Sequence, residues 1–279
     1  MIKIKTFKKF KTIFFFLFII ASILFSSCSK VSESDFNIIN SSVEKTNLQN
    51  KYKASFVFEV RDTEKEELVM FVQGTYSIDK FDEKYSGPIL SGEIVQTVLN
   101  TPSSMKIAFY DDTYVSVSDG YKILSDMDKD LLLNQFMCAP AYLFSMDKLF
   151  SIDSSEVSGG TMYTVKADDD KNLYLQQLLG DDIYSFSGMK KPQKDLTKYS
   201  DIVFKYVISE ENLLLSRETT YTVFAYDTVP YSPAYQGTNE DYKRTFSVSL
   251  KLNYKSFGDD VFIDISDFLP EESSENISE

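Results

Sequence analysis

The chain has 279 residues, of which 43% are hydrophobic, so it is long and apolar enough to bury the core of one large domain. Its net charge of -13 disfavours contact with nucleic acid phosphates and with anionic lipid head groups. The absence of histidine removes the usual general base near neutral pH and the commonest zinc ligand, so we expect a protein that is not an enzyme and uses no cofactor.

The first 27 residues have the parts of a signal peptide. Five lysines precede an apolar run over 13–25, and two serines and then Cys28 follow. The positive segment stays in the cytoplasm, the apolar run enters the membrane, and the small residues admit a peptidase. This order resembles the bacterial lipoprotein signal, in which the cysteine is acylated and becomes the mature N-terminus. The resemblance implies lipidation of Cys28 and attachment to the bilayer at the extracytoplasmic face of the cell membrane.

Two other fates of this segment stay open. Phe25 stands where lipoprotein signals usually carry leucine, and an ordinary signal peptidase that cuts after Ser29 would release a soluble protein. The apolar run could also stay uncut as an anchor, although it is short against the ~20 residues that a spanning helix needs. Loss of the signal would change the net charge to -18, and residues 28–34 would form a polar tether.

Residues 35–268 are predicted to form a single domain that begins with a helix. Phe36, Ile39 and Val43 have helical spacing, and Ser34 or Asp35 can cap the helix. Strands are expected to follow. Their predicted bounds are 54–60, 67–78, 92–99, 105–110 and 113–118, with turns at Asp111-Asp112 and, as a type I′ pair, at Asp119-Gly120.

The middle of the chain is predicted to be helical. Asp126 or Asp128 can cap an apolar run that contains residues 131–137, and Pro140 ends it and can begin a second turn over 142–144. Cys138 falls in this stretch, which favours a buried and unreactive thiol. A hairpin over 156–167 and a short helix over 171–179 are expected next.

The last third of the chain returns to strands. Alternation along the chain predicts strands over 201–208 and 245–254, and the turn at Glu211-Asn212 leads into a long strand over 213–226. A final strand is expected to contain Val261, Ile263 and Ile265. The acidic residues 269–279 are predicted to be disordered. We therefore expect an α+β fold of nine to eleven antiparallel strands in a strongly curved sheet, with helices on its concave side.

This order of elements resembles the LolA/LppX-like lipoproteins, which have a half-barrel fold. The resemblance implies that the curved sheet and its helices enclose an apolar cavity for a lipid or another hydrophobic ligand. The residues expected to line it are Phe56, Phe58, Met70, Val72, Ile107, Phe109, Phe204, Tyr206, Phe246, Val248 and Leu250. An ordinary, filled core is the alternative interpretation of the same apolar face.

Two other features are candidate sites. Acidic runs at 168–170, 181–182 and 259–260 lack the alternating pattern of a calcium loop and fall at predicted turns or helix starts, so no metal site is expected. The loop 227–243 carries several tyrosines and prolines, which suit contact with a protein or with sugar rings.

Three hypotheses follow for function. The first is a membrane-anchored, non-enzymatic lipoprotein that binds a lipid in an apolar cavity. The alternative is an anchored interaction module that binds an envelope protein or a glycan through the 227–243 loop or an exposed sheet edge. A glycosidase that works with carboxylates alone is a distant third.

Overall fold

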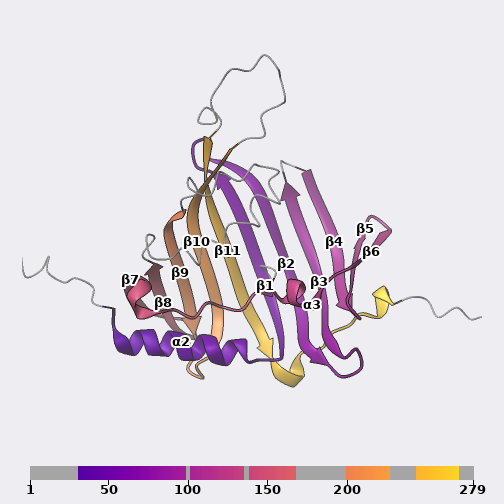
Figure 1. Ribbon diagram of the computed structural model, residues 1–279, viewed down its shortest axis with the longest axis horizontal. Coiled ribbons are helices and arrows are strands. Elements are labelled where there is room, and N and C mark those ends of the chain that lie inside the picture. Colours follow the sequence, from indigo (N-terminus) through magenta and orange to yellow (C-terminus); the bar gives the residue numbers. More distant parts are fainter. Residues whose placement is uncertain (1–30, 99–100, 135–137, 168–198, 227–242, 270–279) are drawn as a thin grey trace, which may run out of the picture.

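The computed structural model describes residues 31–98, 101–134, 138–167, 199–226 and 243–269. Its framework is one open sheet of eleven antiparallel strands (Figure 1). Strands β1 to β6 follow one another outward from the centre, and β11 to β7 do so on the other side. The strands are β1 (Lys51–Asp62), β2 (Glu67–Asp82), β3 (Gly87–Val98), β4 (Thr101–Tyr110), β5 (Thr113–Ser118), β6 (Tyr121–Asp126), β7 (Leu149–Val157), β8 (Gly160–Ala167), β9 (Tyr199–Ile208), β10 (Leu214–Tyr226) and β11 (Lys243–Phe257).

The first and last strands of the sheet, β1 and β11, pair at its centre and join the two halves. The outermost described strands, β6 and β7, do not pair with each other, so the described part of the sheet is not closed. The predicted number of strands is confirmed, and so is their antiparallel arrangement.

The tight turns follow the residues that the sequence singled out. Asp119 and Gly120 both have positive φ, at 50° and 81°, as a type I′ pair between β5 and β6 requires. Asp111 and Asp112 also have positive φ, at 48° and 56°. Aspartate tolerates this conformation better than most residues, which explains its use at both turns.

Helix α2 (Glu33–Asn47) precedes the sheet. Its N-cap is Ser32, whose hydroxyl accepts a hydrogen bond from the Asp35 N–H at 3.3 Å, so the prediction of a cap at Ser34 or Asp35 was wrong by two or three residues. The buried side of α2 faces strands β7, β9 and β10. This side consists of Ile39, Ser42, Val43 and Thr46.

The predicted helical middle is mostly wrong. The short helix α3 (Lys129–Asn134) forms, but residues 138–145 run as an irregular segment, which continues into the 3₁₀ turn η1 (Met146–Lys148). We call residues 138–148 the strap. The strap is not helical because the backbone groups of Ala141 and Phe144 bond to side chains of α2 instead of to their own chain.

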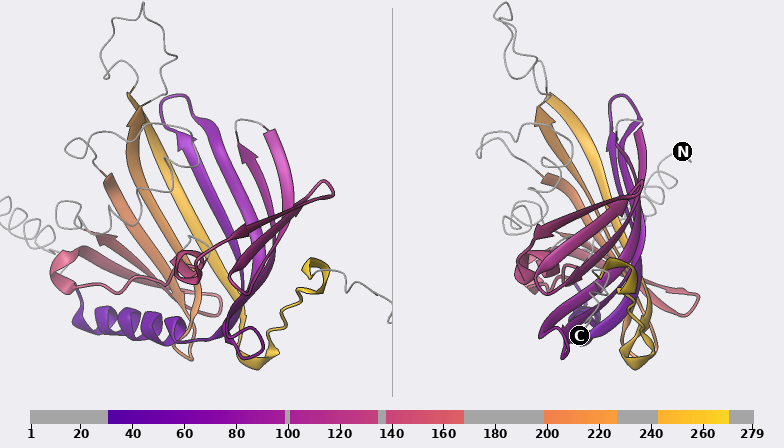
Figure 2. Two further views of the ribbon diagram at one scale, coloured as in Figure 1. Left: turned by 45° about the vertical axis from the view of Figure 1, so that its right-hand side comes forward. Right: turned by 90° about the vertical axis from the view of Figure 1, so that its right-hand side faces the viewer.

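The final predicted strand is also wrong. Residues 261–265 are irregular and lie between two 3₁₀ turns, η5 (Gly258–Asp260) and η6 (Ser266–Phe268). They follow β11 directly, and β1 and β10 already occupy both sides of that strand, so no adjacent edge is free to receive another strand. The segment instead packs on the face of the sheet that lies away from α2 (Figure 2).

The two faces of the sheet are therefore buried by different parts of the chain. Helix α2 and the strap pack on one face, which holds the main hydrophobic core and which we call the apolar face. Residues 258–269 cover part of the other face, which we call the outer face. A small second core forms there, of Ile89, Ala108, Tyr110, Val115, Ile265 and Phe268.

Candidate functional site

The register places all the predicted ligand-lining residues on the apolar face. Residues directly opposite one another in antiparallel strands point to the same side of a sheet. Phe58 of β1 lies opposite Val72 and Leu250, and Leu250 lies opposite Thr219, which in turn lies opposite Phe204. The other predicted residues join the same face in this way. They are Phe56, Met70, Ile107, Phe109, Tyr206, Phe246 and Val248.

These side chains are covered. Ten of the eleven are buried, and Leu250 is half-buried. The sequence thus located a shared apolar surface that reaches from β4 to β9. That any of these residues contacts a ligand stays a prediction.

The strap lies across the apolar face and is fastened to α2 by two asparagines. The side-chain amide of Asn47 donates to the Ala141 carbonyl at 2.9 Å, and its oxygen accepts from the Ala141 N–H at 3.0 Å. Asn40 bonds to Phe144 in the same way, with both distances 3.0 Å. Two residues seven apart on a helix lie on one side of it, so both asparagines face the strap.

Aromatic side chains of the strap fill the space over β9. The rings of Tyr142 and Phe144 meet the Phe204 ring edge-on, at centroid distances of 5.3 and 5.1 Å. Phe144 also meets Tyr206 at 6.0 Å. Aromatic pairs in this geometry stabilise a fold by more than the burial of their surface alone. In this structure the strap therefore forms part of the hydrophobic core.

Replacing Asn47 with alanine is expected to loosen the strap. The Ala141 N–H and C=O would lose their partners, and an unsatisfied buried polar group costs about 1–3 kcal/mol. Amide hydrogen exchange should show protection at Ala141 reduced about tenfold or more. Ser41→Ala is the control, because that exposed hydroxyl donates to the Ile38 carbonyl of the same helix and, among the described residues, has no bond to the strap. Unchanged exchange at Ala141 in the Asn47 variant would contradict the assigned fastening.

Two glycines stand where neighbouring atoms leave no room for a side chain. A Cβ atom on Gly74 would lie 2.3 Å from the Glu93 carbonyl oxygen and 2.9 Å from the ring of Phe56, and one on Gly92 would lie 2.7 Å from the Thr75 carbonyl oxygen and 2.9 Å from the Cβ of Tyr76. The ring of Phe56 and the first atoms of Tyr76 therefore lie against the backbone of a neighbouring strand. This close approach explains why glycine stands in strand interiors, where it is otherwise unfavourable.

Polar groups gather at the centre of this apolar face. Tyr52 and Tyr76 meet edge-on at a centroid distance of 5.9 Å, and Tyr52 meets Tyr254 at 5.7 Å. Arg217 of β10 and the thiol of Cys138 lie among these rings and affect their ionisation. Burial raises the pKa of the Tyr52 and Tyr76 hydroxyls well above their ordinary value, so both stay neutral.

Sequence reasoning missed Arg217. In the predicted strand 213–226, Arg217 stands between the polar residues Ser216 and Glu218. The sequence pattern alone therefore does not indicate on which face of the sheet its side chain lies. Its position opposite Tyr206 and Leu252 identifies that side, and this pairing follows only from the register of β9, β10 and β11.

The thiol of Cys138 is buried, as predicted, although not on a helix. Burial raises its pKa to about 12, against the opposing influence of Arg217 and Lys80. Because the thiolate is the reactive form, we expect iodoacetamide at pH 8 to leave Cys138 of the folded protein unmodified. Peptide mass spectrometry should find it alkylated after unfolding in guanidinium chloride. Rapid alkylation of the folded protein would show that the site opens readily.

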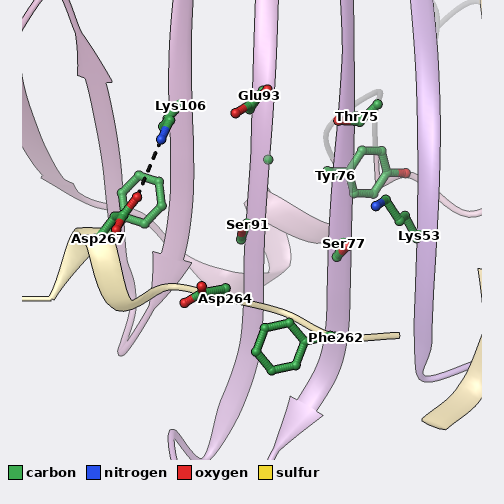
Figure 3. Close-up of a pocket in the computed structure, with 12 residues that line it drawn as sticks. Lys53, Thr75, Tyr76, Ser77, Ser91, Glu93, Lys106, Phe262, Asp264 and Asp267 are labelled. Carbon is green, nitrogen blue, oxygen red and sulfur yellow. Dashed lines mark hydrogen bonds and ion pairs between the residues drawn. The ribbon is translucent and has the colours of Figure 1, made fainter. Parts of the chain in front are cut away.

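The two pockets that can be described lie on the outer face. The larger has a volume of about 280 Å³ and lies between β1 to β4 and the segment 262–268 (Figure 3). Lys106 and Asp267 form an ion pair of 3.5 Å across it, and Phe262 lies at its edge. Its other labelled residues are Lys53, Thr75, Tyr76, Ser77, Ser91, Glu93 and Asp264. The second pocket, of about 240 Å³, is lined by residues that include Glu59, Asp201, Thr220 and Ser249.

Several predicted features fall outside the described residues. Cys28, the acidic runs 168–170 and 181–182, and the loop 227–243 except Lys243 are among them. Asp259 and Asp260 lie in η5. In the described ranges, no cluster of three His, Cys, Asp or Glu residues is arranged to hold a metal ion. Among the described helices, none has the length and hydrophobicity to cross a membrane.

No protein-family model matches the chain, and no curated protein does. Among solved structures, LprF from Mycobacterium bovis is similar over 84% of this chain and 98% of its own, with 10% identity and a TM-score of 0.46. The LolA superfamily protein NE2245 from Nitrosomonas europaea matches over 83% of this chain and 94% of its own, with 8% identity and a TM-score of 0.25. A DUF1329 family protein from Desulfovibrio piger has the same coverage, with 9% identity and a TM-score of 0.25.

TM-scores below 0.5 mean that the chain paths agree only in part, so the similarity decides nothing about ligand or activity. The proposals below rest on the residues of this chain.

Proposed function

We propose that this protein is a non-enzymatic lipoprotein, anchored through acylated Cys28 outside the cytoplasmic membrane, that binds a lipid or another hydrophobic ligand on the apolar face of its sheet. The observation that carries the proposal is the gathering of large apolar side chains from β1, β2, β4, β9 and β11 on one face of an open sheet. In this proposal the apolar face is the inner, concave face, and the strap and α2 lie over the ligand.

The cover over this face supports binding more than a permanently sealed core. The strap is a single segment without an α-helix or a strand, and its polar links to the rest of the chain include the two asparagine pairs and a hydrogen bond from Arg217 to the Ala139 carbonyl. Such hydrogen bonds can be replaced one by one by bonds to water or to a ligand. If a second sheet covered this face instead, the two sheets would have to separate along their whole length.

The driving force would be the removal of acyl chains from water. Each methylene buried contributes ~0.8 kcal/mol, so a chain of ordinary length supplies enough to compensate for displacing the strap. Without residues 1–27 the net charge would be -18, which works against attraction to anionic membranes, so the acyl anchor would provide the contact with the bilayer.

Native mass spectrometry of the protein purified from its host tests the proposal. We expect a population heavier than the polypeptide by the mass of a lipid, and extraction with organic solvent should remove that excess. If no hydrophobe accompanies the protein, and added lipid does not bind either, the proposal fails.

A second candidate, an interaction module, is favoured by the outer edge of the sheet. Every residue of β6 is exposed, and Tyr121, Ile123 and Leu124 present apolar side chains there. An envelope protein that adds a strand to β6 would use its unpaired edge. Ile123→Lys should then abolish capture of such a partner while lipid binding stays unchanged. A glycan would have to be held elsewhere, for example by the 227–243 loop.

A further inference from the structure

Arg217 is a positive charge buried at the centre of the apolar face. Its position in β10 lies between Tyr206 of β9 and Leu252 of β11, and only 7% of the residue is exposed. Arginine is almost never buried unless it is paired. The partners of this guanidinium therefore decide what it does.

The guanidinium has more donors than the chain satisfies. It carries five N–H groups, and one of its terminal nitrogens, Nη2, donates to the carbonyl oxygen of Ala139 in the strap. Its Nε is buried and has no hydrogen-bond acceptor. In the described part of the chain, no carboxylate forms an ion pair with Arg217.

A second arginine shows how this chain treats a cation that serves only structure. Arg244 of β11 is largely buried too, and the carboxylate of Asp62, which is fully inaccessible, accepts hydrogen bonds from it. The chain thus supplies an acidic partner at one covered arginine but, within the described residues, none at the other.

The groups around Arg217 are neutral or positive. Burial by itself lowers the pKa of the guanidinium, but Tyr52, Tyr76, Tyr206 and Tyr254 act in the opposite direction and bring it above its ordinary value, so the charge persists. The Nζ atom of Lys80 lies 5.6 Å from the centre of the Tyr52 ring and donates to the Asn47 carbonyl at 2.7 Å. Burial lowers the pKa of this lysine. Both cations oppose the rise in the pKa of the Cys138 thiol, and Arg217 donates to the carbonyl of the next residue of the strap, Ala139.

A buried charge without a counter-ion is destabilising, because the ion loses its hydration without gaining an opposite charge. Hydrogen bonds to neutral oxygens offset part of that cost. An anion held by the guanidinium would offset more, because the flat fork of N–H donors, which includes the free Nε, matches the oxygens of a carboxylate or a phosphate.

We propose that Arg217, assisted by Lys80, binds the anionic head group of an amphiphile whose hydrocarbon chain lies on the apolar face. This inference rests on the proposed function and specifies its ligand class as fatty acids or lipid phosphates. On binding, the head group would take over donors of Arg217 and compete with the Ala139 carbonyl, so that entry of the ligand releases one fastening of the strap.

Three ligands with the same chain and different heads test this inference. Decanoate, decyl phosphate and decanol are titrated by calorimetry into the protein expressed from its full coding sequence and freed of bound lipid. Inorganic phosphate is the fourth titrant and lacks a chain. The variants are Arg217→Gln, Arg217→Lys and Lys80→Gln. Lys205→Gln is the matched control, because it removes a positive charge on the outer face of the adjoining strand, where Lys205 pairs with Glu218 at 3.2 Å.

The protein should bind the two charged ligands at least about tenfold more tightly than decanol, the ratio expected when a charged hydrogen bond is made. Arg217→Gln should abolish that preference while decanol binding changes less than about twofold. Arg217→Lys should keep part of it, Lys80→Gln should reduce it several-fold, and Lys205→Gln should leave it intact. Thermal unfolding of each variant verifies that it folds. If Arg217→Gln does not fold, Lys80→Gln provides the test.

Four results would overturn the inference. Equal binding of the charged and neutral ligands, or a preference that survives Arg217→Gln, would assign Arg217 to fastening the strap alone, and the proposed function would stand. Inorganic phosphate binding as tightly as decyl phosphate would identify a free-anion site. If none of the three chain-bearing ligands binds, the proposed function itself fails.

Discussion

Replacing Phe204 with alanine is expected to lower the free energy of unfolding by about 3–5 kcal/mol, the usual cost of removing a fully buried phenylalanine. Phe204 is 0% exposed, and its ring meets Tyr142 and Phe144 of the strap as well as the ring of Tyr206. The cavity would open where the strap joins β9, so little else can collapse into it. Denaturant unfolding of the variant measures the loss.

Phe150→Ala is the matched control, because Phe150 is 68% exposed and belongs to β7, which is separated from β9 by one strand. A surface change of this kind should alter stability by less than about 0.5 kcal/mol. Equal losses in the two variants would contradict the assignment of Phe204 to the core beneath the strap.

Replacing Asp62 with alanine should destabilise the protein by a similar amount, about 3–5 kcal/mol, because one partner of a buried ion pair is lost. One carboxylate oxygen accepts from the N–H groups of Glu64 and Lys65, at 2.9 Å each, and so shapes the turn between β1 and β2. The other accepts from Arg244 Nε at 2.6 Å. Glu59→Ala, which breaks an exposed pair with Arg61, should cost less than about 1 kcal/mol.

The contribution of Asp62 should depend on pH. Burial by itself raises the pKa of this carboxyl, but the two backbone N–H groups and Arg244 bring it below its ordinary value of 3.8. A carboxyl whose pKa is lower in the folded than in the unfolded state stabilises the fold at every pH above its unfolded-state pKa. This stabilisation is lost as the pH falls through the folded-state pKa. The difference between the wild type and Asp62→Ala should therefore be largest at neutral pH and shrink below pH 3.8. A constant difference would contradict the ion pair.

The sheet and its apolar face could be predicted from the sequence because both depend on local alternation. Phe56 and Phe58, or Phe246 and Val248, reveal their shared side by a period of two, and the Asp119-Gly120 turn reveals where a hairpin closes. Strand β6 gave no such signal, because all its residues are exposed.

What failed depends on contacts between distant residues. The path of the strap is fixed by Asn47 and Asn40, which lie 94 and 104 positions before the residues that they bind. Val261, Ile263 and Ile265 alternate as a strand does, but they follow a strand whose two sides are occupied. The tyrosines that influence Arg217 come from four strands, β1, β2, β9 and β11, and its hydrogen-bond acceptor comes from the strap, so only the assembled register reveals the charge among the tyrosines.

Photo-crosslinking with a fatty acid that carries a diazirine on its chain tests most directly whether hydrocarbon lies on the apolar face. Peptide mass spectrometry after illumination should find the label on residues of that face, such as Phe56, Phe204 and Leu252, with excess decanoate suppressing the reaction. Label confined to outer-face residues such as Thr75 and Phe262, or label that decanoate does not suppress, would contradict the account.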